Sequence, residues 1–188
     1  MTNRNRLRSL TLIALMNAFV IALIAVQLVI PLAFVPLLCI VPTVFAIETY
    51  IAPLRLTLLS CLIVIGVAAL GFGLAVGLWA AVYVLAGVVA GLTRRWKWPT
   101  VARDVALALV LLALVGGVIA AFTLLAGLSL TDLLGQASDV VARGPKMPVA
   151  VPIEGIIAVG GAIFVITFAI LIDRLLNTIL SRLPIKLA

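Results

Sequence analysis

Long runs of apolar residues, separated by short polar connections, dominate the chain. An α-helix rises about 1.5 Å per residue, so crossing a hydrocarbon core about 30 Å thick takes about 20 apolar residues. Six segments approach this length, and they cover residues 10–30, 32–47, 54–70, 73–92, 105–128 and 156–172. We therefore predict an all-α integral membrane protein with six transmembrane helices, forming a single membrane domain over residues 1–188.

The second segment differs from an ordinary spanning helix because it is short and contains Pro36 and Pro42. Neighbouring helices can satisfy the carbonyl groups that proline frees, but a re-entrant loop is an alternative. With six spans and a cytoplasmic N-terminus, eleven basic residues lie inside and two, Arg143 and Lys146, lie outside. Without the second span, five lie inside and eight outside. The positive-inside rule favours six spans with both termini in the cytoplasm.

Composition supports the membrane class. Of 188 residues, 66% are hydrophobic and 10% are charged, which leaves too little polar surface for a soluble domain. The formal net charge of +7 could suggest nucleic-acid binding. The basic residues, however, lie in short connections between apolar runs, so membrane orientation explains them better and no nucleic-acid partner is expected. We predict a multi-pass protein of the cell membrane, in contact with lipid.

Several kinds of chemistry lack their residues. The chain has no histidine, which removes His-based metal sites and His-dependent catalysis. Cys39 and Cys61 lie inside apolar spans and are expected to be small packing residues. There is no GxxxxGK[ST] phosphate loop, and no charged residue falls in the middle of a predicted span. We therefore expect neither an enzyme nor a self-sufficient ion-coupled carrier, and no cofactor or metal.

Two further segments carry amphipathic patterns. In the external loop 129–155, Ser129-x-x-Asp132 resembles a capping box and apolar residues follow at helical spacing, which predicts a short external helix before the last span. This helix is either a surface spacer or a lid over an external cavity. The tail, residues 173–188, predicts an amphipathic helix at the inner interface that ends near Pro184; docking of a cytosolic partner is the alternative.

Small residues recur every four positions on two predicted helices. The first span carries Ala14, Ala18 and Ala22, and the fourth carries Gly-x-x-x-Gly at residues 73–77 and 87–91. Small faces allow close helix contact in lipid. On the fourth span we expect internal packing. On the first span, the alanine face lies either against the bundle or against a second protein.

Trp79 and Tyr83 lie on one face of the fourth span, about 9 Å and about 15 Å from its outer end. Aromatic side chains with polar groups at this depth either line a pocket that opens outward or pack in the core. With Asp132, Gln136 and Asp139 of the external loop they form our candidate substrate-binding set. A further group of polar residues faces a cavity or links helices: Asn17, Gln27, Thr123 and Thr167.

The chain resembles the substrate-binding S component of energy-coupling-factor (ECF) transporters in three features. These are its length, its six predicted spans with both ends inside, and the pattern Ala14-x-x-x-Ala18-x-x-x-Ala22. The resemblance implies that the alanine face of the first helix docks a transmembrane T component linked to two cytosolic ATPases. It also implies capture of a vitamin-like small molecule from outside, in a pocket of the later helices. The alternative is a structural or assembly subunit of a larger membrane complex.

Overall fold

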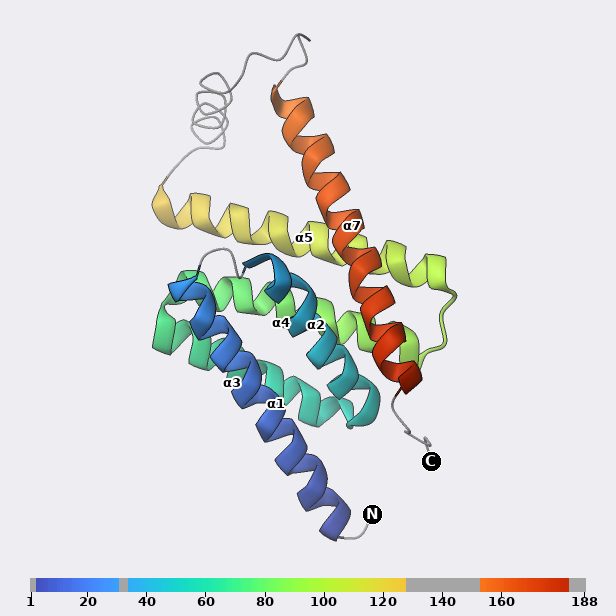
Figure 1. The fold of residues 1–188 in the computed structure, drawn as a ribbon. Helices are drawn as coiled ribbons and strands as arrows, with labels where there is room; N and C mark the ends of the chain where they lie inside the picture. Colours follow the sequence, from blue (N-terminus) through green and yellow to red (C-terminus); the bar gives the residue numbers. More distant parts are fainter. Residues whose placement is uncertain (1–2, 31–33, 128–152, 183–188) are drawn as a thin grey trace.

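The computed structural model describes residues 3–30, 34–127 and 153–182, and all of its elements there are helices. These are α1 (Asn3–Val29), α2 (Phe34–Ile51), α3 (Leu54–Phe72), α4 (Leu74–Arg95), α5 (Thr100–Ala126) and α7 (Ile153–Arg182). Successive helices run in opposite directions, so α1 begins and α7 ends at the same end of the bundle (Figure 1). The predicted all-α class is confirmed.

Five helices of the described part are long and apolar enough to cross a membrane: α1, α3, α4, α5 and α7. In α2 the described apolar stretch, Cys39–Ile51, is shorter, so the second span remains a prediction. The chain thus has the helices of a multi-pass membrane protein. The external helix predicted after Ser129 lies outside the described residues.

Helix boundaries differ from the hydropathy pattern at three places. The second segment continues as a helix to Ile51, past its predicted end at Ile47. The fifth begins at Thr100 rather than Val105, directly after Pro99. The sixth span and the first part of the tail form one helix, α7, of 30 residues, which is about 45 Å long. Leu176 of this tail is fully buried against the bundle.

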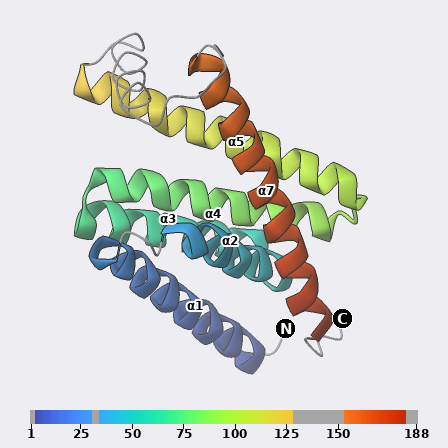
Figure 2. The same cartoon turned by 45° about the horizontal axis from the view of Figure 1, so that its top comes forward.

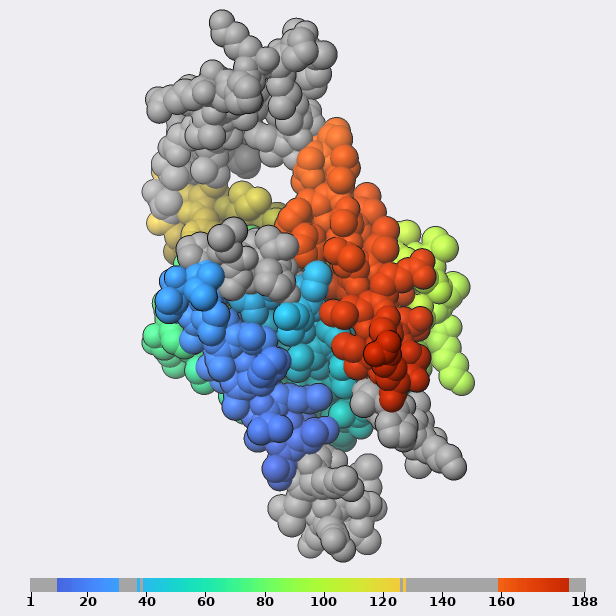
Figure 3. Space-filling view, in the orientation of Figure 1, coloured from blue at the N-terminus to red at the C-terminus, as the bar shows by residue number. Residues whose placement is uncertain are grey.

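The proline-containing helix α2 is the centre of the bundle. It contacts α1, α3, α4 and α7, and in the face drawn in Figure 3 it lies between α1 and α7. Val41, Phe45 and Ala46 have no exposed surface. Phe45 belongs to a core cluster shared with α1, α3, α4 and, through Phe168, α7, whereas Ala46 belongs to a second cluster shared with α4, α5 and α7. The two faces of α2 therefore join the two halves of the core.

Helices α2 and α4 pack closely against each other, and glycines make this possible. A Cβ atom added at Gly87 would collide with the carbonyl oxygen of Pro42 and the Cβ of Phe45. A Cβ added at Gly91 would lie 2.6 Å from the carbonyl oxygen of Ala46 and 2.6 Å from the Cβ of Thr49. Dispersion between closely approaching backbones stabilises helix pairs in lipid. The internal-packing interpretation of these two glycines is confirmed.

Helix α4 lies between α5 on one side and α2 and α3 on the other, with α1 beyond them (Figure 2). The outer helices expose many large apolar side chains, such as Leu15 on α1, Leu109 on α5 and Ile163 on α7. Exposed apolar surface of this extent is expected where a helix faces lipid rather than water.

A single residue, Gly73, separates α3 from α4, as the Gly71-Phe72-Gly73 sequence predicts. Its φ is 101° and its ψ is 157°, a backbone conformation that is essentially restricted to glycine. The Gly73 N–H donates a hydrogen bond to the carbonyl of Ala69, and the Gly73 carbonyl accepts one from the Gly77 N–H. The turn therefore closes one helix and opens the next.

Replacing Gly73 with alanine is expected to lower the unfolding free energy by about 2 kcal/mol, because a Cβ atom strains this conformation. Gly71→Ala is the matched control, since its added Cβ meets no atom within 4 Å and its φ is not positive. Thermal unfolding of the two variants in detergent, followed by tryptophan fluorescence, provides the measurement. Equal losses in both would show that the turn conformation is not the cause.

Candidate functional site

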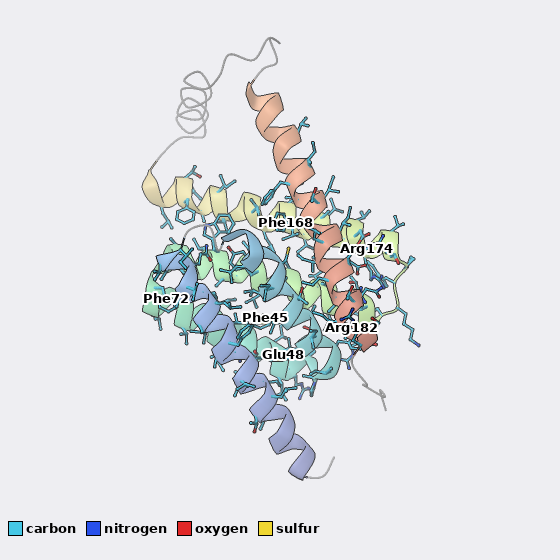
Figure 4. The ribbon with its side chains drawn as sticks, in the orientation of Figure 1. Phe45, Glu48, Phe72, Phe168, Arg174 and Arg182 are labelled. Atoms are coloured by element: carbon cyan, nitrogen blue, oxygen red, sulfur yellow. The ribbon has the colours of Figure 1, made fainter. Side chains whose placement is uncertain are left out.

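A cluster of polar side chains from three helices lies inside the bundle. We call Asn17 of α1, Glu48 of α2 and Ser60 of α3 the polar cluster. Glu48 has no exposed surface, Ser60 is 1% exposed and Asn17 is 7% exposed. Glu48 is labelled in Figure 4, where α2 passes through the middle of the bundle. Polar groups buried in a membrane domain are costly, so they are candidates for function.

Ser60 is the central member of the polar cluster. Its Oγ lies 2.6 Å from Oδ1 of Asn17 and 3.1 Å from Oε2 of Glu48. Both are hydrogen-bond distances. Because the two partners come from α1 and α2, the hydroxyl on α3 connects three helices. The prediction that Asn17 either faces a cavity or links helices is settled in favour of a link.

Two oxygen atoms beside these contacts have no hydrogen-bond partner among the described residues. They are Oε1 of Glu48 and Oγ1 of Thr57. Thr57 is fully buried and lies one helical turn before Ser60, on the same face of α3. Unpaired buried oxygens are uncommon in proteins and call for a physical explanation. Here they accompany the single acidic side chain that α2 carries.

Glu48 lies three residues before the end of α2, not in its middle, and whether α2 crosses the membrane remains a prediction. Hydropathy ends the second segment at Ile47 because a glutamate follows, and this places Glu48 in a connection. In the structure α2 continues to Ile51, and its central position keeps the carboxyl group away from both water and lipid. Hydropathy alone therefore misses one acidic side chain that is buried inside the bundle.

Trp79 and Tyr83 lie together, as their spacing predicts, with ring centroids 6.4 Å apart. Tyr83 is 1% exposed and belongs to the core cluster formed with α1, α2 and α3. The side chain of Gln27, on α1, interacts with the Tyr83 hydroxyl. Trp79 is half-buried and packs against both core clusters. For Tyr83 this arrangement is core packing rather than the lining of a described pocket.

Some of the remaining candidate residues lie outside the described part of the chain, and the others make local contacts. The other members of the substrate-binding set lie outside the described residues: Asp132, Gln136 and Asp139. Thr123 and Thr167 donate hydrogen bonds to carbonyl groups of their own helices, and within the described part of the chain they do not link helices. Cys39 and Cys61 are free thiols that pack in or against the core, as expected.

The alanine face of α1 points away from the bundle. Ala14, Ala18 and Ala22 are all exposed. The opposite face of the helix is buried, and it consists of Ile13, Asn17, Val20 and Ile24. This face does not pack against the core of the described residues, and its contact with a second protein remains a prediction. Sequence alone could not decide this, because alanine suits both a tight core contact and a smooth outer surface.

Charged side chains meet at the end of the bundle where α4 ends and α5 begins. Nη2 of Arg94 lies 2.8 Å from Oδ1 of Asp173, and Nε of Arg103 lies 3.3 Å from the same oxygen. Arg94 also donates to the Asp173 carbonyl, and Arg95 donates to the carbonyl of Ala52. We call Arg94, Arg103 and Asp173 the charge cluster. It joins α4, α5 and α7.

A cavity of about 210 Å³ lies between α4 and α5, away from the polar cluster. Seven apolar residues line it: Leu78, Ala81, Val82, Ala113, Leu114, Gly117 and Val118. Neither Trp79 nor Tyr83 is among them. The cavity has no polar side chain that would orient a ligand.

The fold and the apolar helices define a class: a helical membrane protein with several membrane-crossing segments. Comparisons with models of known protein families, with curated proteins and with solved structures find no match.

Proposed function

We propose that the chain is the substrate-capture subunit of an ECF-type importer, which docks a transmembrane partner through α1. One observation carries the proposal: Ala14, Ala18 and Ala22 form an exposed face while the opposite face of the same helix is buried. The three alanines extend over about 12 Å of helix. A partner helix has room to approach the α1 backbone closely along this length.

Helix association in lipid needs such a surface, because apolar side chains gain nothing by leaving lipid for one another. Close backbone packing supplies the attraction instead, and small residues permit it. Leu15 and Phe19 are 69% and 52% exposed beside the alanines, and they offer large side chains to the flanks of an approaching helix. The face therefore combines a shallow groove with apolar borders.

Dependence on a partner also follows from the sequence. Active import needs an energy source, and the chain contains no phosphate-binding loop for nucleotide hydrolysis. A T component with its cytosolic ATPases would supply it. In this proposal, the substrate is a vitamin-like small molecule. The half-buried Trp79, near the start of α4, contributes to its site together with Asp132, Gln136 and Asp139.

Ala18→Leu is expected to weaken partner association by about tenfold or more, because the larger side chain keeps a second helix away from the groove. Ala120→Leu is the matched control, since Ala120 is exposed on α5, far from α1 in sequence. The measurement is the amount of T component and ATPases that co-purifies from native membranes in mild detergent. Unchanged thermal stability of Ala18→Leu would show that the variant is folded.

Two outcomes would contradict the proposal. If Ala18→Leu unfolds the isolated chain, the alanine face belongs to its own core. If an unrelated membrane complex co-purifies and mass spectrometry finds no bound small molecule, the chain is a structural or assembly subunit, which is the alternative function. A bound small molecule that is lost on Trp79→Ala would support capture.

A further inference from the structure

We propose that Glu48 is an intramembrane proton-binding site, whose carboxyl group exchanges a proton while its hydrogen bonds to Ser60 and Asn17 reverse direction. This inference does not depend on the proposed function. It follows from the burial of the polar cluster, from the absence of a counter-ion for Glu48 in the described part of the chain, and from a count of the available hydrogen atoms.

Glu48 is a carboxyl group that has no exposed surface and no ion-pair partner among the described residues. An ionised carboxylate buried without a cation is so unfavourable that the group binds a proton instead. The orphaned Oε1 of Glu48 agrees with this, since a carboxylic acid needs fewer hydrogen bonds than a carboxylate. The expected ligand is therefore a proton.

Among the side chains that the structure describes on the helices packed against α2, none forms an ion pair with Glu48. Arg94 is paired with Asp173, and Arg95 donates to the Ala52 carbonyl. Among residues whose side chains the structure describes, the ionisable groups on the helices around Glu48 are Cys61 and Arg55 on α3, Tyr83, Arg94 and Arg95 on α4, Asp173, Arg174 and Arg182 on α7, and Cys39 and Tyr50 on α2 itself. The side chains of Arg4, Arg6 and Arg8 on α1 and of Glu154 on α7 lie outside the described residues. Of these, Cys61 directly follows Ser60 on α3 and carries no positive charge.

The geometry favours a proton over a metal ion. A separation of 2.6 Å between Ser60 Oγ and Asn17 Oδ1 is that of an O–H···O hydrogen bond, so a proton already occupies the space between them. None of the residues of the polar cluster lines the described cavity between α4 and α5. A ligand larger than a proton would have to displace packed side chains.

Ser60 has one hydroxyl proton for two contacts. When it donates to Oδ1 of Asn17, its contact with Oε2 of Glu48 must carry a proton supplied by Glu48, which is then a neutral acid. When Glu48 loses that proton, the hydroxyl turns to donate to the carboxylate, and the Asn17 amide must rotate to donate an N–H to Ser60. Gain or loss of one proton therefore reverses a hydrogen-bond chain from α2 through α3 to α1.

Glu48 lies near one end of α2. Ala52 follows Glu48 by one helical turn, about 6 Å along the axis, and Pro53 beyond it is exposed. Thr57 lies on α3, with its unpaired Oγ1. Hydroxyl groups both accept and donate hydrogen bonds, so Thr57 is suited to hand a proton between the turn and the cluster.

The experiment is infrared spectroscopy of the full chain in lipid nanodiscs, with carbon-13 in the carboxyl groups of its glutamates. The chain contains only two glutamates, Glu48 and Glu154, so Glu154→Gln leaves a single labelled carboxyl. At neutral pH we expect the isotope-shifted band of a hydrogen-bonded carboxylic acid, which is converted to a carboxylate band in alkaline buffer. Ser60→Ala should move the acid band to the frequency of a weaker hydrogen bond.

Three results would overturn the proposal. One is a carboxylate band from Glu48 at neutral and mildly acidic pH. Another is a change of the band on replacing potassium by sodium at constant pH, which would indicate a metal-cation site. The third is an acid band that Ser60→Ala leaves unmoved, which would remove Ser60 from the chain. The measurement on Glu154→Gln needs no substitution at Glu48, so it does not depend on whether a Glu48 variant folds.

Discussion

Gly91→Leu is expected to destabilise the protein by about 3 kcal/mol or more, the largest loss that we predict for a single substitution. The α2–α4 contact has no room for a side chain at this position. A Cβ atom alone would lie 2.6 Å from a backbone oxygen of Ala46, whereas non-bonded heavy atoms pack about 3.5–4.0 Å apart. Leucine adds three more carbon atoms in the same direction.

The helices can accommodate leucine only by moving apart, because the atoms that it meets belong to the α2 backbone and to Thr49. Separation would also break the packing of Phe45 and Ala46, which lie on the two sides of α2. Loss of stability should therefore be cooperative across both core clusters. Thermal unfolding in detergent, and the fraction of protein recovered as a single species, are the measurements.

Gly116→Leu on α5 is the matched control, because its added Cβ meets no atom within 4 Å. Replacing glycine in a helix interior generally gains up to about 1 kcal/mol of helix propensity. Little change or a small gain is expected there. Comparable losses at Gly91 and Gly116 would show that leucine harms the protein through something other than the α2–α4 contact.

Asp173→Ala is expected to cost about 3 kcal/mol, because it leaves two guanidinium groups without their shared carboxylate. The side chains of Arg94 and Arg103 are only 8% and 18% exposed. Arg94 would keep its hydrogen bond to the backbone carbonyl of residue 173. The lost stability should therefore come mainly from the Arg103 contact that links α5 to α7.

Arg182→Ala, at the exposed end of α7, is the matched control and is expected to change stability little. Asp173→Asn should lie between Asp173→Ala and the wild type, since the amide keeps one acceptor oxygen and loses the charge. A double-mutant cycle of Arg94→Ala and Asp173→Ala measures the pair itself. Additive losses in that cycle would show that the two residues contribute independently.

The sequence predicts the helical segments well because an apolar run long enough to cross a bilayer has few other structures available to it. The sequence also predicts the turn at Gly73 and the packing role of Gly87 and Gly91, because glycine permits both a tight turn and close contact between helices. What hydropathy cannot show is which helix is central. Glu48 looks like the polar end of a span until its surroundings are known.

The candidate sites show the same limit. The spacing of Trp79 and Tyr83 correctly predicts that their rings lie together, but not that Tyr83 faces the core. The alanine spacing on α1 predicts a small face without giving its direction. Contacts such as Ser60 with Asn17 join residues far apart in the chain, and no local pattern encodes such a contact.

The central position of α2 has a consequence for the order in which the protein is made. This helix carries an internal proline and a buried acid, which make it a poor match for lipid on its own. Its main glycine-lined partner, α4, is synthesised only after α3 and the turn at Gly73. Translation must therefore proceed beyond Gly91 before α2 can be enclosed. Until then, the residues of α2 around Phe45 and Ala46 lack the α4 packing that buries them in the finished protein.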